Sequence, residues 1–299
     1  MLIFCPIIDD PIYLGKTDMT KPSLSKEEFK LIRDYIEENC GISLGDKKEY
    51  LLETRLSGLL NENGCSTYKD LYLQAKNSPR SGLRDKIVDA MTTNETLWFR
   101  DTYPFDVLKS EILPEYHSQM KTGKRRMVRI WSAACSSGQE PYSTVMTVME
   151  FAKSTANIRP EAFQILATDI SPSVLLSASS GVYDEFAIKR GLPKPYLDSY
   201  FEKKGRFWSV KNDVRKPITF KQFNLQSPFL SLGKFDVVFC RNVAIYFSEE
   251  FKKELFSKIA AVLNPGGYMF LGGSESLIGL SEQFQIIKHK GGSYYKVHR

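Results

Sequence analysis

The stretch from Val128 to Ser143, VRIWSAACSSGQEPYS, constrains the fold of this 299-residue chain more than any other segment. VRIW predicts a buried strand, Ala133 to Gln139 a tight loop of small residues, and Pro141 the first position of a helix. Small residues let a loop backbone approach a ligand, and a helix N-terminus offers it free N–H groups. The stretch predicts a strand-loop-helix nucleotide pocket, although an ordinary strand-to-helix connection would have the same pattern.

This loop lacks the residues that bind a pyrophosphate. It has neither a Lys-Ser/Thr pair after its glycine nor the three glycines of GxGxxG. Glu140 would repel an anion, but its carboxylate suits a ligand that carries an ammonium, a sulfonium and ribose hydroxyls. These properties favour S-adenosylmethionine as the ligand.

A second apolar run, FQILATDIS from Phe163 to Ser171, ends in the acid Asp169. An acid at the carboxyl end of the second strand of a βαβ unit is placed to accept both ribose hydroxyls. The alternative is that Asp169 only caps the following helix, which would begin near Pro172.

A third strand is expected from Phe235 to Cys240, where every residue but one is apolar and the polar pair Arg241-Asn242 follows. Ligands of parallel sheets lie outside the carboxyl ends of the strands, so residues 242, 243 and 246 would face the crevice. An amphipathic helix is then expected from Glu249 to Leu263, stopped by residues 264–267 (NPGG) and followed by a strand.

Five motifs in this order resemble the chemotaxis receptor methyltransferases, the CheR family. They are TTNET-x-x-FRD (92–101), WSAAxSxGxEPYS (131–143), ATDIS (167–171), FCRNVxIYF (239–247) and LNPGGYxFLGxSES (263–276). The match runs from about residue 23 to the C-terminus. The resemblance implies an α/β fold: a Rossmann-like class I methyltransferase domain with a small inserted antiparallel β subdomain, preceded by an all-α N-terminal domain.

The resemblance also implies an activity. Members of the family transfer the methyl group of S-adenosylmethionine to glutamates in the cytoplasmic domains of chemoreceptors, giving methyl esters for sensory adaptation and S-adenosylhomocysteine as product. A glutamate with a pKa of about 4.3 is already ionised at neutral pH, so alignment matters more than a strong base. None of the three histidines, His117, His289 and His298, lies in a motif, which argues against a hydrolytic triad.

Arg100 and Tyr246 are the catalytic residues that the resemblance implies. Arg100 would hold the acceptor carboxylate by a forked pair of hydrogen bonds; the alternative is a surface arginine paired with Asp101 or Asp106. The Tyr246 ring would favour the sulfonium beside the methyl group; the alternative is a core tyrosine with a satisfied hydroxyl.

The cofactor contacts carry over position by position. Asn94, Thr96 and Arg100 would line the pocket, while Glu140 and Asp169 would bind the methionine and ribose portions. The adenosine end and the pocket floor would be contacted by Asn224, Leu225, Asn242 and Val243. The family often has two acids directly before the proline that corresponds to Pro141, whereas here Gln139 takes the first place. Activity therefore requires that the second acid, Glu140, be the one that contacts the cofactor. Cys135 in the loop is interpreted as a buried thiol without a chemical role.

Composition fits a two-domain enzyme that reaches membrane receptors from the cytoplasm. The net charge of +6 comes from dispersed lysines and arginines, which argues against a nucleic-acid partner. Five cysteines without a CxxC motif indicate a reduced protein, and no apolar run approaches the ~20 residues that span a bilayer. We expect a monomer without a metal, since no metal-ligand cluster is found.

Along the chain, we expect a poorly ordered leader over residues 1–22, short helices over 23–90, a linker and connecting helix over 91–127, and the methyltransferase domain over 128–299. A helix from Ser25 to Glu38 begins with a capping box. Another from Asp46 to Asn61 corresponds to one that contributes basic residues toward receptors in the family, but it lacks an arginine cluster and equally suits a solvated face of a packed helix.

The β insertion is expected at about residues 205–223, as a hairpin with a polar turn at 211–213. In some relatives such a subdomain binds a peptide from the receptor C-terminus by strand addition; the alternative is that it only covers the cofactor crevice. Two other functions stay open on the sequence: an RNA methyltransferase, and a non-catalytic sensor that binds the cofactor and signals through its helical domain.

Overall fold

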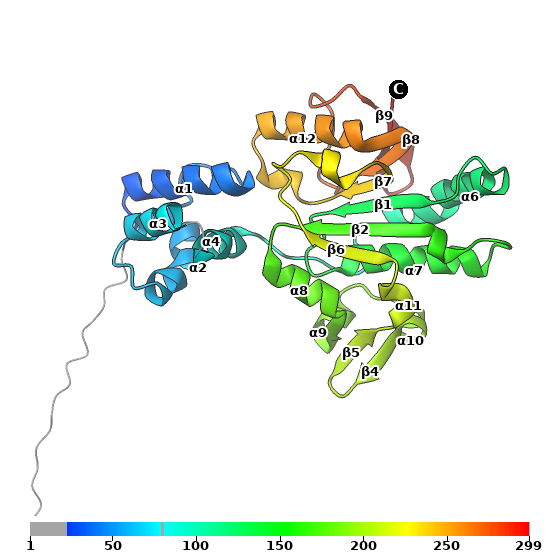
Figure 1. Ribbon diagram of the computed structural model, residues 1–299, viewed down its shortest axis with the longest axis horizontal. Helices are drawn as coiled ribbons and strands as arrows, with labels where there is room; N and C mark the ends of the chain where they lie inside the picture. The colour runs from blue at the N-terminus through cyan, green and yellow to red at the C-terminus, as the bar shows by residue number, and fades with distance from the viewer. Residues whose placement is uncertain (1–22, 79–80, 299) are drawn as a thin grey trace, which may run out of the picture.

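The computed structural model describes residues 23–78 and 81–298 (Figure 1). The predicted leader, residues 1–22, lies outside the described residues. The chain first forms a bundle of helices packed on one apolar core, which contains Ile32, Leu56 and Ile87. These helices are α1 (Lys26–Cys40), α2 (Glu49–Glu62), α3 (Tyr68–Asn77) and α4 (Leu83–Met91). In Figure 1 the bundle stands beside the larger α/β part of the molecule.

Both ends of α1 follow from its sequence. The Ser25 side chain accepts from the Glu28 N–H while the Glu28 carboxylate accepts from the Ser25 N–H, so the predicted capping box is confirmed. The helix ends at Cys40, because Gly41 adopts φ 75° and closes it. The helix expected from Asp46 begins only at Glu49.

The central sheet has the strand order β6-β2-β1-β7-β8-β10-β9. Its first five strands in that order are parallel, and β10 pairs antiparallel with β8 and β9. The bounds are β1 (Val128–Ala133), β2 (Phe163–Asp169), β6 (Ile218–Gln222), β7 (Phe235–Cys240), β8 (Leu263–Phe270), β9 (Phe284–His289) and β10 (Gly292–Val297). The strands expected from Phe163 and Phe235 are confirmed.

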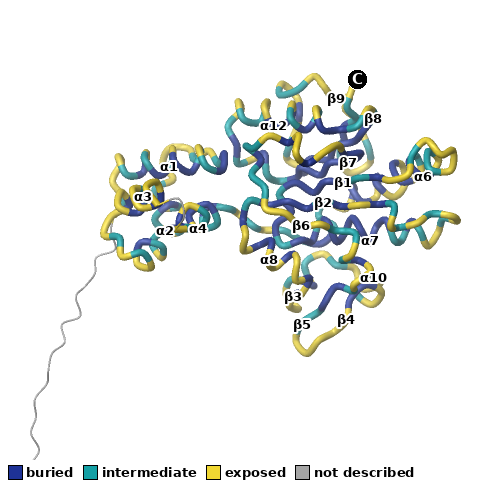
Figure 2. Tube along the Cα trace, viewed as in Figure 1, coloured by how far each residue is buried: buried dark blue, intermediate teal, exposed yellow. Residues whose placement is uncertain are grey.

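Helices cover both faces of this sheet, because successive strand residues point to opposite sides. Ile130 and Val237 pack in one core with α7 (Gln139–Lys153), whereas Trp131 and Val238 pack in another with α12 (Glu249–Val262). Helix α8 (Pro172–Ser180) lies on the α7 side, as Figure 1 shows. In Figure 2 the buried part of the trace is concentrated in these strands. The fold is therefore the expected doubly covered α/β domain behind an all-α domain.

Two predicted boundaries differ in instructive ways. Helix α7 begins two residues before Pro141, because Gly138 at φ 95° turns the chain into the helix earlier. The NPGG segment (264–267) does stop α12, but its residues belong to β8 and do not precede it. The pairing of β8 with β7 is irregular between Phe235 and Val237.

The hairpin predicted at 205–223 is wrong in its pairing. The small antiparallel sheet has the order β3-β5-β4, formed by β3 (Val182–Asp184), β4 (Phe201–Lys204) and β5 (Phe207–Val210). Its turn lies at Gly205, where φ is 62°, and not at residues 211–213, which lead into α11 (Asn212–Arg215). Residues 218–222 form β6 and pair parallel with β2 instead.

The remaining elements connect these parts. They are α5 (Tyr103–Val107), the π-helical turn η2 (Leu108–Ile112), α6 (Leu113–Lys121), η3 (Pro160–Ala162), α9 (Glu185–Lys189), α10 (Lys194–Tyr200), η4 (Phe229–Leu232) and η5 (Ala244–Tyr246). In the part of the chain that the structure describes, no helix combines the length and the apolar character required to cross a membrane.

Candidate active site

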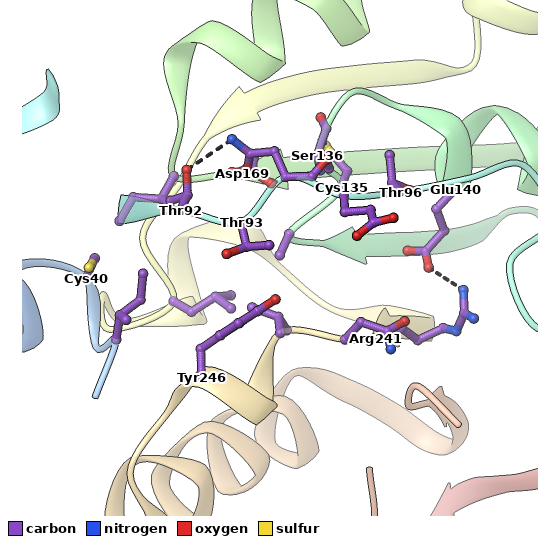
Figure 3. Close-up of a pocket in the computed structure, with 18 of the residues that line it drawn as sticks. Cys40, Thr92, Thr93, Thr96, Cys135, Ser136, Glu140, Asp169, Arg241 and Tyr246 are labelled. Carbon is purple, nitrogen blue, oxygen red and sulfur yellow. Dashed lines mark hydrogen bonds and ion pairs between the residues drawn. The ribbon is translucent and has the colours of Figure 1, made fainter. Parts of the chain in front are cut away.

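A pocket of about 920 Å³, its open mouth included, lies where the carboxyl ends of β1, β2, β6 and β7 meet the helical bundle. Every site residue predicted from the sequence lines it: Asn94, Thr96, Arg100, Glu140, Asp169, Asn224, Leu225, Asn242, Val243 and Tyr246. The bundle side contributes Cys40 and Ile42, which the sequence did not indicate. Figure 3 shows Asp169 and Tyr246 on opposite sides of the cavity.

The β1–α7 loop brings its backbone to the cavity. Ala134 and Ser136 both adopt positive φ, at 60° and 50°, and both line the pocket. Gly138 has no room for a side chain, since a Cβ atom there would lie 3.0 Å from both the Ala178 Cβ and the Tyr183 hydroxyl. The loop is thus folded tightly against α8 and β3.

Asp169 at the end of β2 is buried between main-chain donors. Its Oδ2 accepts from the Ser136 N–H at 2.8 Å and its Oδ1 from the Ser171 N–H at 3.0 Å. Burial raises the pKa of Asp169, and these N–H groups oppose that shift. The helix-cap alternative is wrong, because the residue that caps α8 is Ser171, whose hydroxyl accepts from the Val174 N–H.

Glu140, in the first turn of α7, shares its two oxygens between two protein donors. Its Oε1 accepts from the Ser132 hydroxyl at 2.7 Å and its Oε2 from Arg241 Nη1 at 2.8 Å. The neighbouring Gln139 is buried, accepts from the Ser137 hydroxyl and is not among the pocket-lining residues. Of the two positions before Pro141, the second, Glu140, therefore faces the cavity.

Arg241 is the most important residue that sequence reasoning passed over. Its side chain is only 2% exposed, and it forms ion pairs with both Glu140 and Asp101 at 2.8 Å. The same Nη2 that reaches Asp101 also donates to the main-chain oxygen of Arg100 at 2.7 Å. The signal was present, since a cation directly after a fully buried strand needs buried partners.

Arg100 lines the cavity. Its Nη1 donates to the main-chain oxygen of Glu95 at 3.2 Å. Within residues 23–78 and 81–298 no carboxylate lies within 4 Å of it, because Asp101 pairs with Arg241 instead. The alternative of an arginine paired with Asp101 or Asp106 is therefore wrong.

The loop after β7 is held from behind by Glu275, a second residue that sequence reasoning missed. Its Oε2 accepts from the N–H groups of Asn242 and Gly272 at 2.6 and 2.7 Å, and its Oε1 accepts from the Ile245 N–H at 3.2 Å. Asn242 itself adopts φ 58°. One carboxylate thus stabilises the left-handed turn that directs Asn242 and Val243 to the pocket.

Two predicted residues are also contacts to the helical bundle. The Asn224 amide donates to the Asn39 main-chain oxygen at 2.7 Å, so its side chain is turned toward α1. The main-chain oxygen of Tyr246 accepts from the Ser43 N–H at 2.8 Å, and Ile42 forms an isolated antiparallel bridge with residue 247. The bundle therefore supplies one wall of the cavity.

The Tyr246 hydroxyl has no hydrogen-bond partner among the described residues, so the alternative of a core tyrosine with a satisfied hydroxyl is wrong. The pocket thiols are poor nucleophiles: burial raises the pKa of Cys40 to about 11 and that of Cys135 well above its ordinary value. This agrees with the interpretation of Cys135 as a buried thiol. His117, His289 and His298 lie away from the pocket lining.

The donor set fits S-adenosylmethionine. The cavity combines two carboxylates, the amides of Asn94 and Asn242, and apolar walls such as Leu225. Within the described residues there is no group of His, Cys, Asp and Glu that could hold a metal ion.

The comparisons with known proteins agree with this geometry. Residues 27–92 match the model for the CheR methyltransferase all-alpha domain, and residues 94–292 match that for the CheR methyltransferase SAM binding domain. The chain is 46% identical to chemotaxis protein methyltransferase Cher2 of Pseudomonas putida over 90% of this chain and 97% of the relative. It is 47% identical to chemotaxis protein methyltransferase 1 of Pseudomonas aeruginosa, over 92% and 99%.

A relative from Vibrio parahaemolyticus, also described as a chemotaxis protein methyltransferase, is 44% identical over 93% of this chain and all of its own length. The similarity thus extends through both the helical bundle and the α/β domain. Together with the two matching domain models, it shows that this chain belongs to the CheR methyltransferase family.

Proposed function

We propose that this protein transfers the methyl group of S-adenosylmethionine to glutamate side chains in the cytoplasmic domains of chemoreceptors. The observation that carries the proposal is Arg100, a cation that has no carboxylate partner in the described part of the chain and lines the same cavity as Glu140 and Asp169. A guanidinium can hold a glutamate carboxylate by a forked pair of hydrogen bonds. The products are a glutamyl methyl ester and S-adenosylhomocysteine.

The cofactor supplies an electrophilic methyl group on a sulfonium. Asp169, whose carboxylate also accepts from two main-chain N–H groups, accepts hydrogen bonds from the ribose hydroxyls. Glu140 faces the methionine portion, while Asn224, Leu225, Asn242 and Val243 border the adenosine end. Asn94 and Thr96 complete the wall that leads to Arg100.

Arg100 and Tyr246 act on the reacting groups. The Arg100 fork aligns the acceptor carboxylate, which needs no base because it is already ionised at neutral pH. The Tyr246 ring favours the positive charge beside the methyl group. The absence of a histidine from the pocket lining agrees with a reaction driven by alignment.

The finer assignments belong to the same proposal. We take the protein to be a cytoplasmic monomer that works without a metal, with its helical domain at 23–90, a connection at 91–127 and its methyltransferase domain at 128–299. The proposed acceptor is a protein and not a nucleic acid, because the relatives of this chain are described as chemotaxis protein methyltransferases. A sensor that only binds the cofactor would have no use for the Arg100 cation.

The test is incubation of the purified protein with methyl-labelled S-adenosylmethionine and chemoreceptor cytoplasmic fragments, followed by mild alkali. We expect label on the receptor that alkali releases as methanol, since carboxyl methyl esters are alkali-labile. Tight cofactor binding by calorimetry without any receptor label would contradict the proposal and favour the sensor. Label on RNA in a parallel reaction would favour the nucleic-acid alternative.

A further inference from the structure

Arg241 joins the two sides of the proposed reaction through one guanidinium. Nη1 donates to the Glu140 carboxylate on the cofactor side at 2.8 Å. Nη2 donates to the Arg100 main-chain oxygen at 2.7 Å and to the Asp101 carboxylate at 2.8 Å on the acceptor side. Figure 3 shows the Arg241–Glu140 pair directly.

The turn that Arg241 holds is a strained one. Phe99, Asp101 and Thr102 adopt φ of 49°, 65° and 53°, which non-glycine residues rarely do. Such conformations persist only where the surrounding structure imposes them. Besides Arg241, two other donors hold this turn: the Phe99 N–H donates to the Ser143 hydroxyl oxygen at 3.1 Å, and the Gly273 N–H donates to Asp101 Oδ2 at 3.3 Å. Arg241 is the charged side chain that holds the turn at Arg100 and Asp101.

Only an arginine can serve both sides at once. The planar guanidinium has donors at fixed angles, whereas a lysine ammonium is a single point charge that can stand beside one carboxylate or the other. The side chain is 2% exposed, so water cannot take the place of a lost contact. The rigid guanidinium therefore fixes the position of the Arg100 main chain relative to the Glu140 carboxylate.

We propose that Arg241 is a positioning residue that sets the placement of the Arg100 turn relative to the Glu140 carboxylate, and so aligns the acceptor with the methyl group. The proposal rests on the proposed function, because alignment matters only if Arg100 holds the acceptor. Arg241 itself touches neither reacting group in this role. Its substitution should therefore damage turnover more than cofactor binding.

The main variant is Arg241→Lys, with Arg125→Lys as the matched control. Arg125 also binds a buried acid, Asp236, and donates to Gln119 at 2.9 Å, but it does not line the pocket. For Arg241→Lys we expect turnover at saturating cofactor and receptor fragment to fall about 100-fold, as for a misplacement of about 1 Å. The calorimetric Kd for the cofactor should rise less than about tenfold. Arg125→Lys should change neither by more than about threefold.

Hydrogen exchange on the cofactor-free proteins gives a readout that is independent of activity. Arg241→Lys should speed exchange in residues 99–103 while leaving the β1 and β7 amides protected, and Arg125→Lys should leave residues 99–103 unchanged. If Arg241→Lys does not fold, Asp101→Ala tests the same support from the acceptor side. It should speed exchange in the same turn and lower turnover with an unchanged cofactor Kd.

Unchanged exchange at residues 99–103, or a Kd that rises as much as turnover falls, would overturn the positioning role. If the unmodified protein fails to label receptors, the proposed function fails, and the turnover comparison is then void. The exchange and calorimetry experiments still decide whether Arg241 supports the turn.

Discussion

At the scale of single residues, the burial of Asp169 determines how binding should depend on pH. Burial raises the pKa of this carboxyl group, so on acidification its charge is lost at a higher pH than for a free aspartate. Cofactor affinity should therefore begin to fall, as pH is lowered, at a pH above the ordinary pKa of an aspartate. The stability of the fold should depend on pH in the opposite direction. Because the folded state binds this proton more tightly than the unfolded state does, the cost of burying the charge appears as pH rises through the folded-state pKa.

Asp169→Asn tests this assignment. We expect an affinity loss of about 10- to 100-fold at neutral pH, the usual effect of removing a charged acceptor, and disappearance of the acid limb. Calorimetry of cofactor binding from the ordinary pKa of an aspartate, about 3.9, up to neutral pH measures both. Asp198→Asn is the control, since that acid is exposed and pairs with Lys194. An equal pH dependence in the unmodified protein and Asp169→Asn would sink the assignment.

Arg100→Ala separates alignment from binding. If the main role of Arg100 is to hold the acceptor carboxylate, transfer should be abolished while the cofactor Kd changes by less than about tenfold. Arg100→Lys should recover little activity, because lysine cannot form the forked contact. Receptor labelling and calorimetry on the same preparations give the two quantities. Parallel loss of both would make Arg100 a cofactor contact only.

At the scale of elements, the end of α1 is a sensitive point. Gly41 closes the helix at φ 75°, and a Cβ atom there would lie 2.6 Å from the Phe251 ring of α12. An alanine in the left-handed conformation costs about 1–2 kcal/mol by itself. Gly41→Ala should lower the free energy of unfolding by more than this amount, because the clash with Phe251 adds to it. It should also weaken cofactor binding, since Cys40 and Ile42 line the pocket.

Gly64→Ala is the matched control for this prediction. Gly64 also adopts a left-handed conformation, with φ 65°, but no atom lies within 4 Å of the Cβ position. Denaturant unfolding of both variants isolates the clash with α12 from the backbone cost. Equal losses of stability, with unchanged cofactor affinity in Gly41→Ala, would show that the packing of α1 on α12 does not matter to the pocket.

Elements with a strong sequence pattern were predictable, and pairings were not. Apolar runs fixed the strands from Phe163 and Phe235, and their carboxyl ends necessarily meet, so the pocket residues on them could be named in advance. Residues 218–222 show the limit, because alternation favours a strand without specifying its partner. The hairpin prediction failed there, as the true partner is β2.

The site residues that sequence reasoning missed act through long-range contacts. Arg241 reaches Asp101, and Glu275 reaches back to Asn242, across stretches of chain that no local pattern relates. In our proposal both residues act by holding other site residues and not by contacting the reacting groups. Side chains that hold other site residues in place become visible only once the fold has brought their partners together.

At the scale of the whole molecule, we predict that transfer does not depend on a metal ion. The acceptor charge is met by Arg100 and the cofactor by carboxylates and amides, so no step in the proposed reaction needs a Lewis acid. Receptor labelling should continue at its full rate in excess chelator. Inhibition that added metal reverses would overturn this view; inhibition that it does not reverse would point to the chelator itself.

The contact between the bundle and the α/β domain has a consequence for protein engineering. The Asn224 side chain donates a hydrogen bond to the end of α1, and the Ser43 N–H donates one to the main chain of Tyr246. The two domains therefore share a wall of the pocket and are not joined by a linker alone. A chimera that takes its helical domain from a relative inherits a foreign piece of the pocket wall. Such exchanges should preserve residues 39–43 of the recipient.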